Sequence, residues 1–212
     1  MEISQKVCLI TGASSGIGAA LAERLGARGG ILALAARRPC DLHGAAGSVH
    51  AVDLSDPGEA LALADEVLER HGRIDLLVLN AATRVDGAVA DVALDDLDAC
   101  FQVNVLSPFV MAGRLAPLMA ARGEGVIATL VAPKVSGGRR GMGAYAASKA
   151  ALESLTQTLR QEVGGKGVAV FAYDPGWVKT DLAPDGKEDP GVAADRLVAH
   201  LEAAKGSREI LS

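Results

Sequence analysis

The sequence predicts a single α/β domain over residues 1–212, in which a doubly wound parallel sheet is sandwiched between helices. Short runs rich in Val, Ile, Leu and Ala alternate with longer segments whose apolar residues recur at helical spacing. The short runs are almost continuously apolar, as expected of strands that are covered on both faces of a parallel sheet. Right-handed crossovers between such strands place helices on both sides of the sheet.

The elements follow from these runs in chain order. The expected strands are Val7–Ile10, Ile31–Ala36, Val49–Val52, Leu76–Leu79, Val126–Val131 and Val168–Tyr173. The expected helices are Ile17–Arg28, Pro57–His71, Leu94–Arg122, Tyr145–Val163 and Val192–Ala204. Arg37–Gly47 contains Pro39 and two glycines, so it is expected to lack a full-length helix. Arg208–Leu211 is expected to form a stub of a final strand.

The composition excludes several functional classes. The net charge is −5, whereas nucleic-acid binding requires a basic patch or stripe. The first residues lack the pattern of a signal peptide, and no apolar run approaches the ~18–20 residues of a membrane span. The three cysteines and four histidines are dispersed, which indicates reduced thiols and no metal site. We therefore expect a cytoplasmic protein that binds neither membranes nor nucleic acids.

A glycine-rich turn follows the first strand and opens directly into a helix. Glycine permits a tight turn, close approach of a ligand and close packing of helix on strand. The helix N-terminus offers unpaired N–H groups and a positive dipole to a pyrophosphate. An ordinary β–α turn is the alternative, but the strand–turn–helix context favours a dinucleotide. The residues expected to bind it are Thr11, Gly12, Ser14, Ser15, Gly16, Ile17 and Gly18.

A phenol and an ammonium group are four residues apart in Tyr145-Ala146-Ala147-Ser148-Lys149. On a helix this spacing brings both side chains to one face, with Cβ atoms roughly 5–6 Å apart. A neighbouring positive charge lowers the pKa of a tyrosine from its usual value of ~10. Such a pair can exchange a proton with an alcohol or carbonyl oxygen. Simple packing of two helical side chains is the alternative.

Taken together, the motifs resemble those of the short-chain dehydrogenase/reductase family, in the family's order and over essentially the whole chain. They are the turn T-G-x-x-x-G-x-G, Asn80-Ala81-Ala82, Asn104, Tyr145-x-x-x-Lys149 and Pro175-Gly176. The resemblance implies a Rossmann-type fold with Tyr145 as catalytic acid/base. It also implies that Lys149 lowers the pKa of Tyr145 and holds the nicotinamide ribose, and that Asn104 anchors a water of a proton relay. A buried structural role for Asn104 is the alternative.

The resemblance assigns further cofactor contacts. Asp53 and Leu54 would flank the adenine. After the fourth strand, Asn80 would line the adenosine, and the backbone of Asn80, Ala81 and Ala82 would border the cofactor. Ala82 replaces the glycine that is usual in the family. The turn after the sixth strand meets the nicotinamide carboxamide, with Pro175, Gly176, Val178 and Thr180.

The end of the second strand indicates the choice of cofactor. Ala36 stands where an acidic residue would bond the ribose 2′-hydroxyl, and Arg37 and Arg38 follow it. An arginine fork suits a 2′-phosphate, so NADP(H) is preferred and NAD(H) remains possible. A solvated basic loop is the alternative reading of the two arginines.

One catalytic position departs from the family. Relatives carry a serine thirteen residues before the tyrosine, and this position is Ala132 here. Losing a positioned donor to a developing oxyanion costs ~10²–10³ in rate. Ser136 is a candidate substitute; alternatively, the substrate orients its own oxygen, or hydride transfer is slow or absent.

We therefore expect an NADP(H)-dependent oxidoreductase that interconverts a ketone and a secondary alcohol, with Tyr145 as proton donor and acceptor. The alternatives are a non-redox enzyme of the same fold (a dehydratase, isomerase or cyclase) and a catalytically impaired nucleotide-binding protein. The short segment Asp181–Asp189 predicts an open substrate mouth. Arg139 and Arg140 beside it would meet an acidic substrate or a carrier phosphate, unless they form a solvated loop.

The expected helices Leu94–Arg122 and Tyr145–Val163 carry more Ala, Leu and Met than one face of a sheet can cover. An apolar helix surface requires a partner, and members of the family pair these helices across a twofold axis. The expected assembly is a homodimer or homotetramer.

Overall fold

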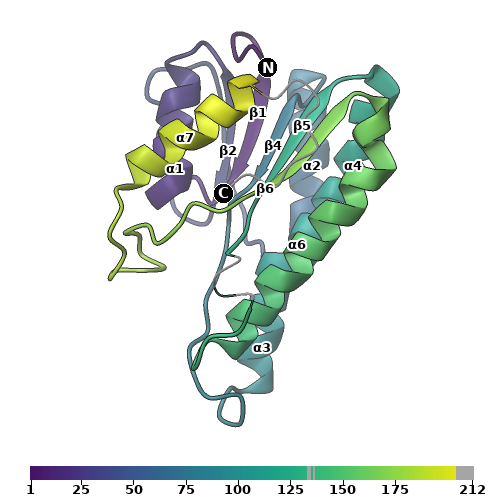
Figure 1. Ribbon diagram of the computed structural model, residues 1–212. Coiled ribbons are helices and arrows are strands. Elements are labelled where there is room, and N and C mark those ends of the chain that lie inside the picture. Colours follow the sequence, from purple (N-terminus) through teal and green to yellow (C-terminus); the bar gives the residue numbers. More distant parts are fainter. Residues whose placement is uncertain (133–134, 136, 204–212) are drawn as a thin grey trace.

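Six parallel strands form one sheet in the order β3-β2-β1-β4-β5-β6 (Figure 1). The computed structural model describes residues 1–132, 135 and 137–203. The strands are β1 (Val7–Thr11), β2 (Ile31–Ala36), β3 (Gly47–Ala51), β4 (Leu76–Leu79), β5 (Gly125–Leu130) and β6 (Val168–Tyr173). The chain winds outward from β1 in one direction and from β4 in the other, so the doubly wound Rossmann-like fold is confirmed.

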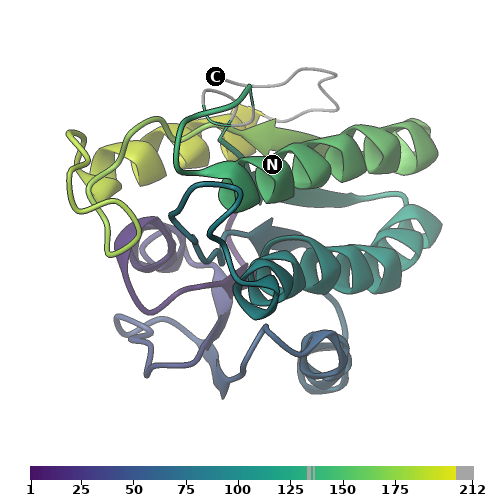
Figure 2. The same ribbon diagram turned by 90° about the horizontal axis from the view of Figure 1, so that it is seen from below.

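Helices cover both faces of the sheet, as Figure 2 shows in a view from below. One layer contains α1 (Gly16–Gly26) and α7 (Pro190–Ala203). The opposite layer contains α2 (Pro57–His71), α4 (Ser107–Arg122) and α6 (Gly143–Val163). α3 (Leu94–Phe101) extends the α4 layer beyond the end of the sheet, and the short helix η2 (Gly164–Lys166) follows α6.

Strand periodicity divides the core into two apolar layers. Cys8 and Ile10 of β1 pack with α1 and α7, whereas Val7 and Leu9 pack with α2, α4 and α6. Successive side chains of a strand point to opposite faces, so both sets of positions in Val7–Ile10 are apolar, and only Thr11 at the end of β1 is polar. Every residue of β1, β4 and β6 is buried, as the continuous apolar runs predicted.

The edge strand β3 differs from that expectation. It begins two residues earlier than predicted, and its burial alternates along the strand. His50 is buried towards α2, but Val49 is 44% exposed. Val49 is in register with Leu34, on the α1 side of the sheet. The segment between β2 and β3 forms no helix, as predicted, and this side of the edge therefore stays uncovered.

The expected long helix Leu94–Arg122 is continuous but not uniform. A π-helical turn, η1 (Gln102–Leu106), separates α3 from α4. Single π turns insert one extra residue into a helix and are frequent at functional sites. Contrary to the expectation from sequence, this 29-residue stretch is long and apolar enough to cross a membrane by length and composition alone. The buried part of its apolar surface packs against the sheet, where Met111 and Leu115 lie in the core.

Helix boundaries differ from the predicted ones by a few residues. α1 ends at Gly26, α6 starts at Gly143, and α7 starts at Pro190. The predictions for Arg208–Leu211 and for Ser136 lie outside the described residues.

Candidate active site

Two strand ends are tied together where the winding of the sheet reverses. Thr11 Oγ1 donates to the carbonyl of Val78 (3.2 Å) and accepts from the amides of Asn80 and Ala81 (3.1 Å each). Asn80 Nδ2 donates hydrogen bonds to the carbonyls of Thr11 (2.8 Å) and Gly12 (3.1 Å). These predicted cofactor residues therefore form the rigid floor of the crevice at the carboxyl ends of β1 and β4, where α/β sheets bind ligands.

Three glycines make the turn after β1 compact enough to carry a ligand. Gly12 has φ +67°, and a Cβ atom there would lie 2.8 Å from Ala81 Cα. A Cβ at Gly18 would collide with the carbonyl oxygen of Gly12. Gly16 has φ +56°, and its Cβ would lie 2.9 Å from Thr180 Cγ2. Only glycine allows the start of α1 to approach both β1 and the loop that holds Thr180.

The N-terminus of α1 has no side-chain cap. Ser15 is extended (φ −159°) and makes no capping hydrogen bond, and the first turn contains no acidic residue. The first backbone N–H groups of α1 are then available to a different acceptor. Ser14 is partly exposed at this end, whereas Ile17 and Gly18 are buried behind it. The turn therefore fits the pyrophosphate of a dinucleotide.

Arg38 joins the glycine-rich turn to the loop after β6. Its Nη2 donates to Ser15 Oγ (2.7 Å) and to Asp181 Oδ2 (2.9 Å). This ion pair is exposed, and the hydrogen bond from Arg38 holds the pKa of Asp181 below its ordinary value. Arg37 is exposed beside it. The two predicted arginines thus stand next to the crevice, and Arg38 already binds a carboxylate.

The adenine end of the predicted site is partly structural. Asp53 Oδ1 accepts from the amide of Ser55 (3.0 Å), and this hydrogen bond is the main reason why the pKa of Asp53 is lowered. Leu54 is buried, and its carbonyl accepts from Ser107 Oγ (2.7 Å). Asp53 remains exposed at the end of β3, where a ligand can reach it, and Ala82 is half-buried.

The loop after β6 reaches the glycine-rich turn. Gly176 has φ +79°, and its amide donates to Asp174 Oδ1 (2.9 Å). Pro175 is fixed through its carbonyl, which accepts from Arg196 Nη2 (3.0 Å). Val178 is buried, and Thr180 lies against Gly16. The structure therefore brings these residues to the same crevice as the turn after β1, as predicted.

Tyr145 and Lys149 lie one turn apart on α6, but their electrostatics differ from the prediction. Lys149 Nζ donates to the carbonyl of Leu130 (2.8 Å) and lies 5.8 Å from the centre of the Tyr145 ring. Burial lowers the pKa of Lys149 to about 8 and raises the pKa of Tyr145 to about 12. The positive group that opposes this rise is Arg84 and not Lys149. The predicted lowering of the Tyr145 pKa by Lys149 is therefore wrong for this structure, in which burial of the phenol outweighs the positive charge of Arg84.

Asn104 is fully buried in the π-helical turn and joins three segments. Its Oδ1 accepts from the amide of Thr83, and its Nδ2 donates to the carbonyl of Thr83, both at 2.8 Å. Nδ2 also lies 2.9 Å from Ser148 Oγ, which itself donates to the carbonyl of Tyr145 (2.8 Å). These are hydrogen bonds of the kind that the structural alternative for Asn104 requires, and the water of a proton relay stays a prediction. Asn104 fixes the loop after β4 to the helix turn that carries Tyr145.

An apolar cluster surrounds Tyr145. Val135, Met142 and Ala146 are buried with it, and Ala132 and Leu182 pack against the cluster. Ala132 lies just after β5 and is the position, thirteen residues before Tyr145, at which relatives carry a serine. It packs against the cluster that contains Tyr145. Tyr145 itself is buried, and 8% of its surface remains exposed.

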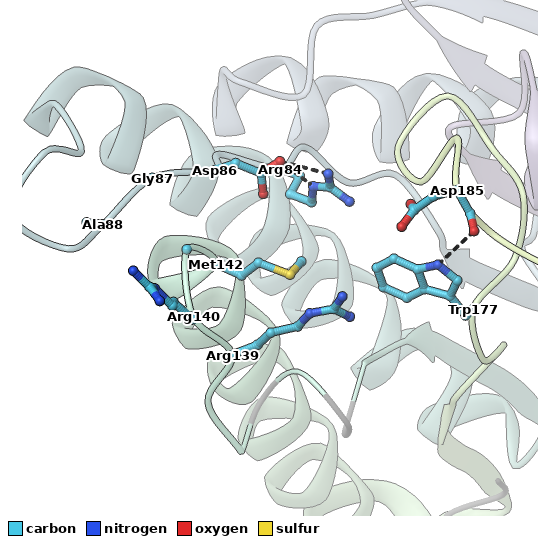
Figure 3. Close-up of a pocket in the computed structure, with 10 residues that line it drawn as sticks. Arg84, Asp86, Gly87, Ala88, Arg139, Arg140, Met142, Trp177 and Asp185 are labelled. Atoms are coloured by element: carbon cyan, nitrogen blue, oxygen red, sulfur yellow. Dashed lines mark hydrogen bonds and ion pairs between the residues drawn. The ribbon is translucent and has the colours of Figure 1, made fainter.

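A hollow of about 370 Å³ opens beside this cluster (Figure 3). Arg84, Met142, Arg139 and Trp177 line it. The guanidinium of Arg139 lies 4.7 Å from the centre of the Trp177 ring. Arg139 was predicted from the sequence to lie near the mouth, whereas Arg84 and Trp177 were not predicted as site residues. The available signal for Arg84 was its place two residues after Asn80-Ala81-Ala82, on a segment already expected at the crevice.

Residues 6–191 match the short chain dehydrogenase family. The meso-2,3-butanediol dehydrogenase of Serratia marcescens is 33% identical over 190 residues, which cover 86% of this chain and 75% of that protein. A metagenomic short-chain oxidoreductase solved in complex with NADP has a TM-score of 0.87 and 31% identity, covering 100% of this chain and 97% of that one. The 3-ketoacyl-(acyl-carrier-protein) reductase of Brucella melitensis, solved with NADH, has a TM-score of 0.87 and 25% identity, covering 99% and 96%. The chain therefore belongs to the short-chain dehydrogenase/reductase family of oxidoreductases.

Proposed function

We propose that this protein is an NADP(H)-dependent oxidoreductase that interconverts a ketone and a secondary alcohol. The observation that carries the proposal is the position of the Tyr145–Lys149 pair. Lys149 bonds the carbonyl of Leu130, the last residue of β5, so the pair stands at the carboxyl edge of the sheet. The uncapped start of α1 lies at this same edge. A proton donor and a dinucleotide site are thus held by one rigid sheet.

The bound nicotinamide would supply or accept the hydride, and the protein supplies position and the proton. The turn from Gly12 to Gly18 would hold the pyrophosphate, and Val178 and Thr180 would border the nicotinamide end. Tyr145 stays protonated at neutral pH because burial raises its pKa to about 12. A neutral phenol can donate its proton to the oxygen of a ketone that receives a hydride, which yields the alcohol.

Replacing Arg38 with Gln is expected to weaken NADPH binding by ~10–100-fold, the effect of losing a charge-assisted hydrogen bond. Arg38 is exposed and bonds Ser15 and Asp181, so it can exchange the carboxylate for a 2′-phosphate. NADH lacks this phosphate, and its binding should change little. Calorimetric titration of both cofactors measures the effect. Equal losses for NADPH and NADH would contradict the assignment.

We also propose that the enzyme is a homodimer or homotetramer formed through the outer face of the long helix. Leu106 (42% exposed), Phe109 (57%) and Leu118 (38%) leave an apolar surface on this stretch. An exposed apolar helix face favours a partner, and a second copy presents the same face.

Three free cysteines support a reducing compartment, and we place the enzyme in the cytoplasm.

Replacing Phe109 with Asp is expected to dissociate the assembly, because each copy would bring a carboxylate into an apolar contact. Sedimentation at micromolar concentration should show a shift to monomer. Val192 is similarly exposed (48%) but lies on α7, in the other layer, so Val192→Asp is the matched control and should leave the assembly intact. A wild-type protein that sediments as a monomer would refute the proposed interface.

A further inference from the structure

The hollow lies next to the apolar cluster that contains Tyr145. Met142 lines the hollow and also packs against Tyr145 in the apolar cluster. The Arg84 guanidinium is close enough to oppose the rise of the Tyr145 pKa. A ligand in the hollow would therefore lie beside the cluster that holds Tyr145.

Two of the lining arginines converge. Figure 3 shows the guanidinium groups of Arg84 and Arg139 extending towards Trp177 on either side of Met142, whereas Arg140 points away from them. They come from distant segments, the loop after β4 and the loop before α6. Converging planar forks are suited to the two oxygens of a carboxylate.

The two converging arginines differ in their partners within the hollow. Arg84 donates from Nε (3.1 Å) and Nη2 (2.7 Å) to the same oxygen of Asp86, Oδ2. Arg139 lies over the Trp177 ring, and no carboxylate of the described residues lies within ion-pair distance of it. Asp86 and Asp185 are the two acidic residues of the lining, and they equal Arg84 and Arg139 in number, because the side chain of Arg140 points away. A carboxylate entering the hollow would therefore meet Arg139 without a competing ion pair among the described residues, beside the apolar surfaces of Met142 and Trp177.

Resting on the function proposed above, we propose that Arg84 and Arg139 bind the carboxylate of a small oxo acid. Its carbon chain would lie between Met142 and Trp177, and its ketone would face Tyr145. The size of the hollow, about 370 Å³, suits a ligand of this kind. Arg84 and Arg139 are positioning residues, because they would hold the far end of the substrate and leave proton transfer to Tyr145. Binding of the carboxylate by Arg84 and Arg139 would also hold the ketone oxygen in place, although Ala132 has no hydroxyl to do so.

The test compares an oxo acid with its own uncharged ester, so that the reacting carbonyl is the same. 3-Oxobutanoate and 4-oxopentanoate are assayed against their methyl esters by the loss of NADPH absorbance. The wild type should prefer the acid in kcat/KM by ~10–100-fold, as expected for charge-assisted bonding, mainly through a lower KM. Arg84→Gln and Arg139→Gln should each reduce this acid/ester ratio by at least ~10-fold. Arg140→Gln, whose side chain points away, should leave the ratio unchanged.

The outcomes separate this inference from the proposed function. Equal use of acid and ester, or equal effects of Arg84→Gln and Arg140→Gln, overturns the carboxylate site while ketone reduction stands. Preference for the N-acetylcysteamine thioester of 3-oxobutanoate over the free acid also overturns it, in favour of a carrier-bound substrate. If no ketone consumes NADPH, the proposed function fails. Calorimetry of 4-oxopentanoate on the NADPH-loaded protein then decides the site alone, since binding must weaken in Arg84→Gln and stay unchanged in Arg140→Gln.

Discussion

Replacing Tyr145 with Phe is expected to lower kcat for ketone reduction by ~10²–10⁴-fold, the usual contribution of a positioned acid/base group. The variant loses only the hydroxyl, and its ring can stay in the apolar cluster with Met142 and Ala146. NADPH binding should therefore remain at the wild-type level. The measurement is NADPH consumption with a ketone, with cofactor affinity determined separately by calorimetry.

The chain provides a matched control in its other tyrosine. Tyr173 is buried in the opposite layer, and its hydroxyl donates to the carbonyl of Ala193 (2.7 Å). Tyr173→Phe should cost about 1 kcal/mol of stability, as for one buried hydrogen bond, and leave kcat unchanged. Wild-type turnover in Tyr145→Phe would end the case for Tyr145 as the proton donor.

The protonation state of Tyr145 also predicts how the rates of ketone reduction and alcohol oxidation depend on pH. Burial raises its pKa to about 12, with Arg84 opposing, so the phenol is protonated throughout the neutral range. Ketone reduction needs the protonated phenol and should be insensitive to pH near neutrality. Alcohol oxidation needs the phenolate, which becomes more populated as the pH rises towards this pKa, so its rate should increase with pH. Tyr145→Phe should abolish that increase.

The strand positions could be predicted because burial and sequence agree at the centre of the sheet. Leu76–Leu79 was predicted with the observed bounds, since both faces of β4 are covered and every residue is apolar. β3 was misplaced because its buried positions, Ser48 and His50, are polar. They satisfy each other through a 2.7 Å hydrogen bond towards α2, which an apolar pattern cannot reveal. The π-helical turn was not predicted either, because Gln102–Leu106 lies within one long apolar stretch that was taken as a regular helix.

The site was predictable where residues follow strand ends in fixed motifs. Thr11, Asn80 and the turn with Gly176 share one edge of the sheet because they end or follow parallel strands, whose carboxyl ends meet there. Tyr145 lies on α6, which Lys149 ties to the end of β5 at the same edge. Their roles were harder to predict, since they depend on burial. Desolvation, absent from any spacing, decides the pKa of Tyr145. Arg84 was missed because it lies between motifs on an irregular loop.

Replacing Ala132 with Ser is expected to raise kcat for ketone reduction by ~10²–10³-fold, if orientation of the substrate oxygen limits the rate. We propose that Ala132 occupies the position of the serine that relatives use for this purpose. It packs into the same cluster as Tyr145, so a hydroxyl there would be close to the phenol. Ala132 is only half-buried, and one added oxygen atom should be tolerated. Ala146→Ser is the matched control, because it adds a hydroxyl to the same cluster from a helical position.

The size of the gain distinguishes between the possible reasons for the alanine. A large gain in Ala132→Ser together with no effect of Ala146→Ser means that the wild type lacks an oxygen-orienting donor. A gain below ~3-fold, well short of the range for a lost donor, means that another group already fixes the substrate. Ser136→Ala then tests the remaining hydroxyl candidate, and the acid/ester ratio tests Arg84 and Arg139. If neither the wild type nor Ala132→Ser consumes NADPH with any ketone although both bind it, the chemistry of Tyr145 is non-redox or absent. In that case the added hydroxyl orients a ketone to which no hydride is transferred.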